Sequence, residues 1–216
     1  MKEKLTELVF ILDRSGSMRD LTDDTIGGFN ALIDSQKKEE GEAFVTTVLF
    51  DDKYEFLHDH VNIKDVKELT REQYYARGMT ALLDAIGRTI NTIGERLANT
   101  PEEERPSRVV IAITTDGFEN ASKEFTKKQV KEMIEHQQSK YSWVFMFLGA
   151  NMDAVSEAES LGIRGSMART YTNSKHGVET VYTAMSASMS VARAAKSTAC
   201  LDELSKDMSS ALDEVE

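Results

Sequence analysis

The stretch LVFILDRSGS, residues 8–17, ends an apolar run in a turn that is rich in oxygen-bearing side chains. Asp13, Ser15 and Ser17 follow the run Leu8–Leu12 within a few residues. A carboxylate and two hydroxyls so close together are compatible with three kinds of chemistry. They could cap the following helix, supply the nucleophile of a hydrolase, or form half of a site for a hard metal ion.

The sequence around these serines lacks the usual signs of a hydrolase. A nucleophile elbow reads Gly-x-Ser-x-Gly, whereas Arg19 stands where the second glycine would follow Ser17. A phosphatase of the aspartyl-phosphate type needs a second aspartate at position 15, which is a serine. None of the histidines stands at an evident general-base position; they are His58, His60, His136 and His176. A Mg²⁺-dependent hydrolase of phosphoesters or acyl substrates therefore stays an alternative function.

The overall composition predicts one soluble domain without a nucleic-acid or membrane partner. A length of 216 residues suits one domain with a small extension. The formal net charge of -11 would repel a phosphate backbone. Cys200 is the single cysteine, which excludes an internal disulfide and is typical of a reducing compartment. The N-terminal apolar run is too short for a signal peptide or a membrane span, so we expect a cytoplasmic protein.

Apolar stretches alternate with amphipathic ones along most of the chain. The predicted buried strands are 8–12, 43–50, 109–116 and 143–150. The predicted helices between them are 25–38, 83–97, 125–138 and 153–163. The alternating stretch 54–63 predicts an exposed or edge strand. This alternation favours an α/β fold with a mostly parallel sheet, whose ligands bind at the carboxyl ends of the strands, where Asp13 and Asp116 stand.

The stretch DRSGS resembles the Asp-x-Ser-x-Ser signature of the von Willebrand factor type A family. That family also has a threonine in a second loop and an aspartate after a later strand. RGMTALLDA supplies Thr80 and ITTDGFEN supplies Asp116, in the expected order. The resemblance implies that Asp13, Ser15, Ser17, Thr80 and Asp116 form a metal-ion-dependent adhesion site. A helix cap would explain one serine, but it would not explain the two later motifs.

The resemblance covers roughly residues 5–195 and implies both a fold and a function. The fold would be a Rossmann-like three-layer α/β structure, with a mostly parallel central sheet, one antiparallel edge strand and helices on both faces. Three hydroxyls and two carboxylates form an all-oxygen set that suits Mg²⁺ or Mn²⁺, and Ca²⁺ less well. By resemblance, Asp13 and Asp116 act largely through bound water, which leaves a position open for an Asp or Glu of a partner protein. The implied function is non-catalytic, metal-dependent protein binding.

Three further residues are predicted to lie on the rim of this site, where they could contact the partner. Asp20 stands where some relatives bind an adjacent ion, but Leu21 replaces their second acid, so a carboxylate at a helix N-terminus is the competing interpretation. Glu119 and Asn120 follow Asp116 directly, and they select the partner or serve as ordinary polar loop residues.

The C-terminal part of the chain changes character after residue 175. Two helical stripes follow one another, and the second contains Leu201, Leu204, Met208, Leu212 and Val215. We expect residues 1–195 to form the domain and residues 196–216 to form an acidic C-terminal helical extension. That extension could pair with a second copy of the chain, so an assembly protein that self-associates through it is another alternative function.

Overall fold

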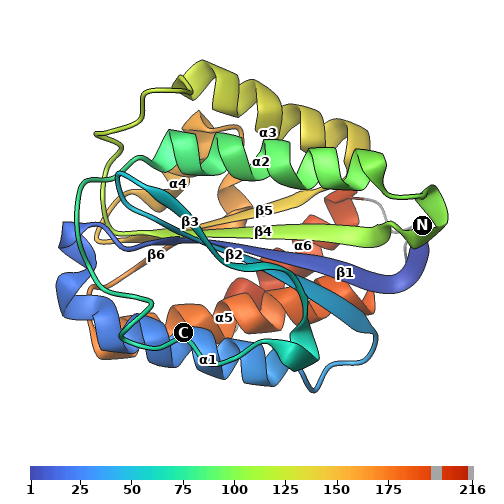
Figure 1. Ribbon diagram of the computed structural model, residues 1–216, viewed down its shortest axis with the longest axis horizontal. Helices are drawn as coiled ribbons and strands as arrows, with labels where there is room; N and C mark the ends of the chain where they lie inside the picture. The colour runs from blue at the N-terminus through green and yellow to red at the C-terminus, as the bar shows by residue number, and fades with distance from the viewer. Residues whose placement is uncertain (196–200, 214–216) are drawn as a thin grey trace.

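The computed structural model describes residues 1–195 and 201–213, which fold around a six-stranded sheet (Figure 1). The strand order across the sheet is β3-β2-β1-β4-β5-β6. The strands are Lys2–Asp13 (β1), Glu42–Phe50 (β2), Tyr54–Asn62 (β3), Pro106–Thr115 (β4), Val144–Ala150 (β5) and Ala168–Tyr171 (β6). The α-helices are Thr22–Gln36 (α1), Leu82–Asn99 (α2), Lys127–Tyr141 (α3), Ala154–Ser160 (α4), Lys175–Ala194 (α5) and Leu201–Asp213 (α6).

The pairing of the strands confirms the predicted sheet. All neighbouring strands run parallel except β2 and β3, and β3 is an edge strand. The first strand is longer than the apolar run 8–12 because Thr6 and Glu7 are buried and continue the pairing. The Glu7 carboxylate can be buried because it accepts a hydrogen bond from Thr46 Oγ1 at 2.7 Å and lies 2.8 Å from His60 Nδ1.

Helices cover both faces of the sheet, as predicted. Figure 1 shows α2 and α3 on one face and α1 and α5 on the other. The apolar stripe of α2 faces the sheet, with Ile86, Ile90 and Ile93 buried. The central strands are therefore enclosed on both sides, and every side chain of Leu8–Leu12 is fully buried. No helix within residues 1–195 and 201–213 is both long and apolar enough to span a membrane.

The C-terminal helix α6 packs back onto the domain, against α5 and the short 3-10 turn Gly165–Met167. Leu204 and Met208 of the predicted stripe are buried in this contact, so this part of the stripe is already covered by the chain itself. The side chains of Leu201, Leu212 and Val215 lie outside the described part of the chain, as does Cys200. The expected boundary between residues 195 and 196 falls at the edge of the described residues.

Candidate metal site

The parallel sheet brings two of the predicted site residues to the same edge. β1 ends at Asp13, and Asp116 directly follows the last residue of β4. The two strands are neighbours in parallel register, with Leu12 opposite Thr114. Because both run in the same direction, their carboxyl ends and the loops that follow lie side by side.

Three of the predicted ligands are in direct contact through their side-chain oxygens. Ser15 Oγ lies 3.0 Å from Ser17 Oγ, and Ser17 Oγ donates a hydrogen bond to Asp116 Oδ1 at 2.5 Å. The hydroxyls come from the loop after β1 and the carboxylate comes from the loop after β4, 99 positions later. This contact joins the first and last motifs of the predicted set.

Thr80 enters the same group from the loop before α2. Its backbone N–H donates to Asn120 Oδ1 at 2.9 Å, and its carbonyl accepts from the Asn120 N–H at 3.0 Å. A Cβ placed on Gly117 would stand 2.9 Å from Thr80 Oγ1 and 3.5 Å from Ser17 Oγ. The glycine therefore leaves free space between hydroxyls of two loops, which a side chain would fill. The structure brings all five predicted residues together at one edge of the sheet.

Asp13 is buried and acts as an internal support of this group. Its Oδ1 accepts from the Ser15 N–H and its Oδ2 accepts from Thr115 Oγ1, both at 2.6 Å. Burial raises the pKa of Asp13 to about 6, although the bonds from Thr115 and Ser15 oppose the rise. Burial also raises the pKa of Asp116, against the hydrogen bond from Ser17. Two carboxyl groups thus lie where burial disfavours their charged form. A bound cation would stabilise their negative charge.

The geometry of the sheet and its helices is shared with several solved structures. Proximal thread matrix protein 1 from the mussel byssus, with a zinc-occupied MIDAS motif, matches with a TM-score of 0.58 and 18% identity over 87% of this chain and 46% of that one. A von Willebrand factor type A protein from Catenulispora acidiphila matches with a TM-score of 0.60 and 16% identity, over 85% of this chain and 42% of that one. Manganese-loaded TRAP protein from Plasmodium vivax matches with a TM-score of 0.57 and 18% identity, over 78% of this chain and 69% of that one.

The chain has the fold of a von Willebrand factor type A (vWA) domain. It spans less than half the length of the mussel and Catenulispora chains. Sequence identities of 16 to 18% show the fold alone. No family model matches this sequence, and no curated protein matches it.

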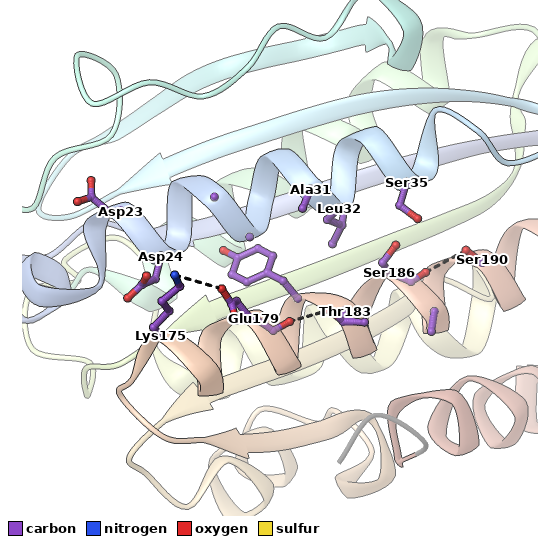
Figure 2. A pocket seen from close by; sticks show the side chains of 14 residues that line it. Asp23, Asp24, Ala31, Leu32, Ser35, Lys175, Glu179, Thr183, Ser186 and Ser190 are labelled. Carbon is purple, nitrogen blue, oxygen red and sulfur yellow. Dashed lines mark hydrogen bonds and ion pairs between the residues drawn. The ribbon is translucent and has the colours of Figure 1, made fainter.

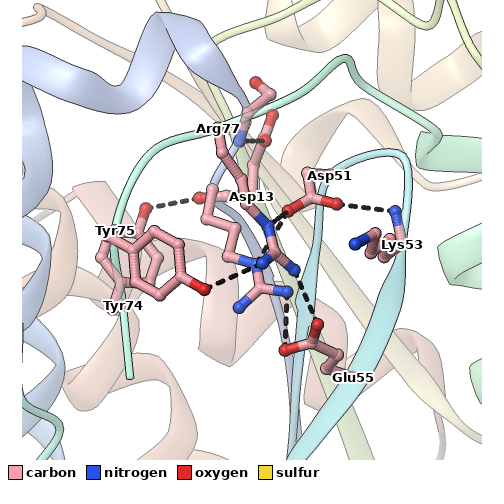
Figure 3. Close-up of polar contacts among 9 residues, drawn as sticks. Asp13, Asp51, Lys53, Glu55, Tyr74, Tyr75 and Arg77 are labelled. Atoms are coloured by element: carbon pink, nitrogen blue, oxygen red, sulfur yellow. Dashed lines mark hydrogen bonds and ion pairs between the residues drawn. The ribbon is translucent and has the colours of Figure 1, made fainter. Parts of the chain in front are cut away.

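An ion network, buried at Arg14 and Asp51 and open to solvent at Glu55, supports the two hydroxyl-bearing loops of this vWA fold (Figure 3). Asp51 Oδ2 accepts from Arg14 Nε at 3.0 Å and from Arg77 Nε at 2.6 Å. Arg14 and Arg77 also pair with Glu55 at 2.7 and 2.6 Å, and Arg14 in particular holds the pKa of Glu55 below its usual range. Arg14 and Asp51 are almost completely buried. The network ties the turn that contains Ser15 to the loop that leads to Thr80.

Backbone bonds strengthen the same connection. The Arg77 N–H donates to the Arg14 carbonyl at 2.8 Å, and the Ala81 N–H donates to the Asp51 carbonyl at 2.9 Å. The buried Tyr74 hydroxyl donates to the Asp13 carbonyl. Sequence reasoning missed the supporting roles of Arg14, Asp51 and Arg77. One signal was available, since Asp51 directly follows an apolar strand just as Asp13 and Asp116 do.

The three predicted rim residues have different surroundings. Asp20 is exposed within the 3-10 helix Gly16–Leu21. Glu119 is occupied inside the chain: its Oε2 accepts from the Leu83 N–H at 2.9 Å and from Ser122 Oγ at 2.7 Å. Asn120 is occupied by its bonds to the backbone of Thr80. Glu119 and Asn120 therefore fix the loop before α2, and their predicted contact with a partner stays a prediction.

Other features of the described residues lie apart from this group. A groove of about 670 Å³ lies between α1 and α5, which also pack against each other, and small and charged side chains from both helices line it (Figure 2). None of the five predicted ligands is among its lining residues. Within residues 1–195 and 201–213, no three His, Cys, Asp or Glu side chains gather so that they could hold a metal. A metal site at the edge of the sheet would therefore depend on hydroxyl ligands as well as carboxylates.

Proposed function

We propose that this chain is a protein-binding module that captures an Asp or Glu side chain of a partner through a divalent cation. Asp13, Ser15, Ser17, Thr80 and Asp116 would hold the cation, which we propose to be Mg²⁺ or Mn²⁺. The contact between the Ser15 and Ser17 hydroxyls and the Asp116 carboxylate carries this proposal, because it joins oxygen ligands from two distant loops.

The residues present fit such an ion. Every side-chain donor is oxygen, which suits Mg²⁺ and Mn²⁺ better than softer metals. Gly117 leaves space between Thr80 Oγ1 and Ser17 Oγ, where any larger residue would intrude. The bound cation would supply the positive charge that attracts a carboxylate from outside. With two carboxylates among the five side chains, the group does not hold enough negative charge to repel that carboxylate from a doubly charged ion.

A binding role is supported better than a catalytic one. Catalysis by this group would need a general base, and the histidines of β3 have other contacts. His58 Nδ1 lies 3.1 Å from Thr47 Oγ1, and His60 Nδ1 lies 2.8 Å from Glu7 Oε2. The names of the mussel matrix protein and of a pilus tip protein from Porphyromonas gingivalis, which is also similar in fold, describe no enzyme. We therefore propose a module without catalytic activity.

Calorimetric titration of the EDTA-treated, dialysed full chain with Mn²⁺ tests the cation site. We expect one ion per chain, and we expect binding to be lost in the double variant Ser15→Ala/Ser17→Ala. The matched control is Ser35→Ala/Ser139→Ala, which removes two exposed hydroxyls from α1 and α3. Equal Mn²⁺ binding by the wild type and by the Ser15/Ser17 variant would refute the proposed ligand set.

A further inference from the structure

Two large apolar side chains stand in solvent on the loops that carry the proposed metal ligands. Met79 directly precedes Thr80 and is 56% exposed, and Phe118 follows Asp116 by two positions and is 68% exposed. Phe118 is the most exposed large apolar residue in the described part of the chain. Single exposed apolar residues are common on protein surfaces, so exposure alone would not point to a binding role. Met79 and Phe118 point to a binding role because both lie next to proposed ligands of the same site.

The loops that carry the two side chains are fixed against each other. The Thr80 carbonyl accepts from the N–H groups of Asn120 and Ala121 at 3.0 and 3.2 Å, and Asn120 Oδ1 accepts from the Thr80 N–H. Consecutive Cα atoms are about 3.8 Å apart, so Met79 lies within about 4 Å of a proposed ligand, and Phe118 lies within about 8 Å of one, measured between Cα atoms. A partner segment whose carboxylate binds the metal would therefore lie within reach of the Met79 and Phe118 side chains.

The charge of the chain makes an additional attraction necessary. The formal net charge is -11, so an acidic partner is repelled at long range. Arg19 and Asp20, both exposed in the 3-10 helix Gly16–Leu21, carry opposite charges and add no net attraction. A single carboxylate on a cation also says little about which partner is chosen, because every protein surface carries carboxylates. Apolar contact at Met79 and Phe118 would supply both affinity and selectivity.

We propose, building on the cation-dependent function above, that the partner segment carries a bulky apolar side chain within about three residues of its metal-binding Asp or Glu. Met79 and Phe118 contact that apolar side chain while the carboxylate binds the cation. The two loops thus select a short acidic-apolar motif of another protein. The recognised chemistry is one carboxylate next to one Leu, Ile, Phe, Met, Tyr or Trp side chain.

Selection from a phage-displayed library of random 12-residue peptides tests this motif. The immobilised full chain is loaded in Mg²⁺, and bound phage are eluted with EDTA. We expect the eluted peptides to be enriched in Asp or Glu with a bulky apolar residue within three positions. Acidic peptides without apolar enrichment would overturn the motif and leave the proposed function standing. If EDTA elutes no acidic peptides at all, the proposed function fails as well, and with it the motif.

A variant pair then connects the motif to the two side chains. Met79→Ser/Phe118→Ser removes both apolar groups, and Tyr141→Ser is the control, since it removes a 58% exposed aromatic at the C-terminal end of α3. By fluorescence polarisation with a selected peptide, we expect the double variant to bind roughly tenfold more weakly or worse. The control should bind like the wild type, and Mn²⁺ binding should be unchanged in all three chains. Equal peptide affinity of the double variant and the wild type would overturn the assignment.

Discussion

Replacing Asp13 with asparagine should stabilise the cation-free protein at neutral pH and also remove its response to Mg²⁺. The Asp13 carboxyl is fully buried, and its pKa is about 6 instead of the ordinary 3.8. At about 1.4 kcal/mol for each tenfold change, holding this group ionised costs the folded state about 3 kcal/mol at pH 7.5. Asparagine has nearly the same shape without the charge.

The surroundings of Asp13 can accept an amide. The Asn oxygen can still accept from the Ser15 N–H, as Asp13 Oδ1 does. Thr115 Oγ1 now donates to Asp13 Oδ2, but it also lies 3.1 Å from the Gly117 carbonyl, to which it can donate instead while it accepts from the Asn amide. We therefore expect Asp13→Asn to raise the free energy of unfolding in EDTA by up to about 3 kcal/mol, or about 6–12 °C in Tm.

The pH dependence gives the sign of the effect. The folded pKa of Asp13 lies above the unfolded one, so the folded state binds more protons between pH 4 and 6. The wild type in EDTA should therefore lose stability as the pH rises through this range, and its deficit against Asp13→Asn should be small at pH 4. Urea unfolding at several pH values measures this deficit. With 10 mM Mg²⁺ at pH 7.5, the wild type should gain stability and the variant should not.

A second buried carboxyl provides a control of opposite sign. Burial would raise the pKa of Asp84, but three backbone N–H groups, from Lys123, Phe125 and Glu124, outweigh burial and hold it below its usual value. Asp84→Asn should therefore destabilise the protein at pH 7.5, and this effect should fade as the pH falls below the ordinary pKa. If both variants shift stability in the same direction, or if the Asp13→Asn difference does not change with pH, the reasoning is wrong.

Three further variants test the surroundings of the site and the packing of α6. Asp51→Asn leaves buried Arg14 without one of its carboxylate partners and should lower the free energy of unfolding by about 3 kcal/mol in urea, whereas a loss below about 1 kcal/mol would contradict the role of the ion network. Gly117→Ala should weaken Mn²⁺ binding at least tenfold by calorimetry, while Gly94→Ala, with no atom within 4 Å of the new Cβ, should leave it unchanged. Met208→Ala should cost about 2–5 kcal/mol of stability, and a negligible change would mean that α6 is not part of the folded core.

Much of the fold was predictable because the sequences of buried parallel strands are continuous apolar runs. Leu8–Leu12 and the runs of β2, β4 and β5 are enclosed by helices on both faces, so few polar residues interrupt them. The alternation of β3 reflects its place at the sheet edge. The first strand was predicted too short because Glu7 is polar, and its burial depends on Thr46 and His60, which lie 39 and 53 positions away.

The sequence indicated which polar residues meet at this edge of the sheet, but it revealed less of what supports them. Asp13 and Asp116 stand at strand ends, which a sequence reveals directly. The pairing of Arg14 with Asp51 and Arg77 could not be read from the sequence, because an arginine in a polar turn usually faces solvent. Here the loop that leads to Thr80 covers it, so its burial depends on tertiary contacts between segments far apart in the chain.

Crystals grown in Mn²⁺, with anomalous diffraction recorded at the manganese edge, would show directly whether the loops after β1 and β4 hold a cation. We expect one anomalous peak about 2.1–2.2 Å from the Ser15 and Ser17 hydroxyl oxygens, beside Thr80 and Asp116. If crystals grown in saturating Mn²⁺ show their manganese peak elsewhere, or no peak at this edge of the sheet, the five residues do not form the cation site.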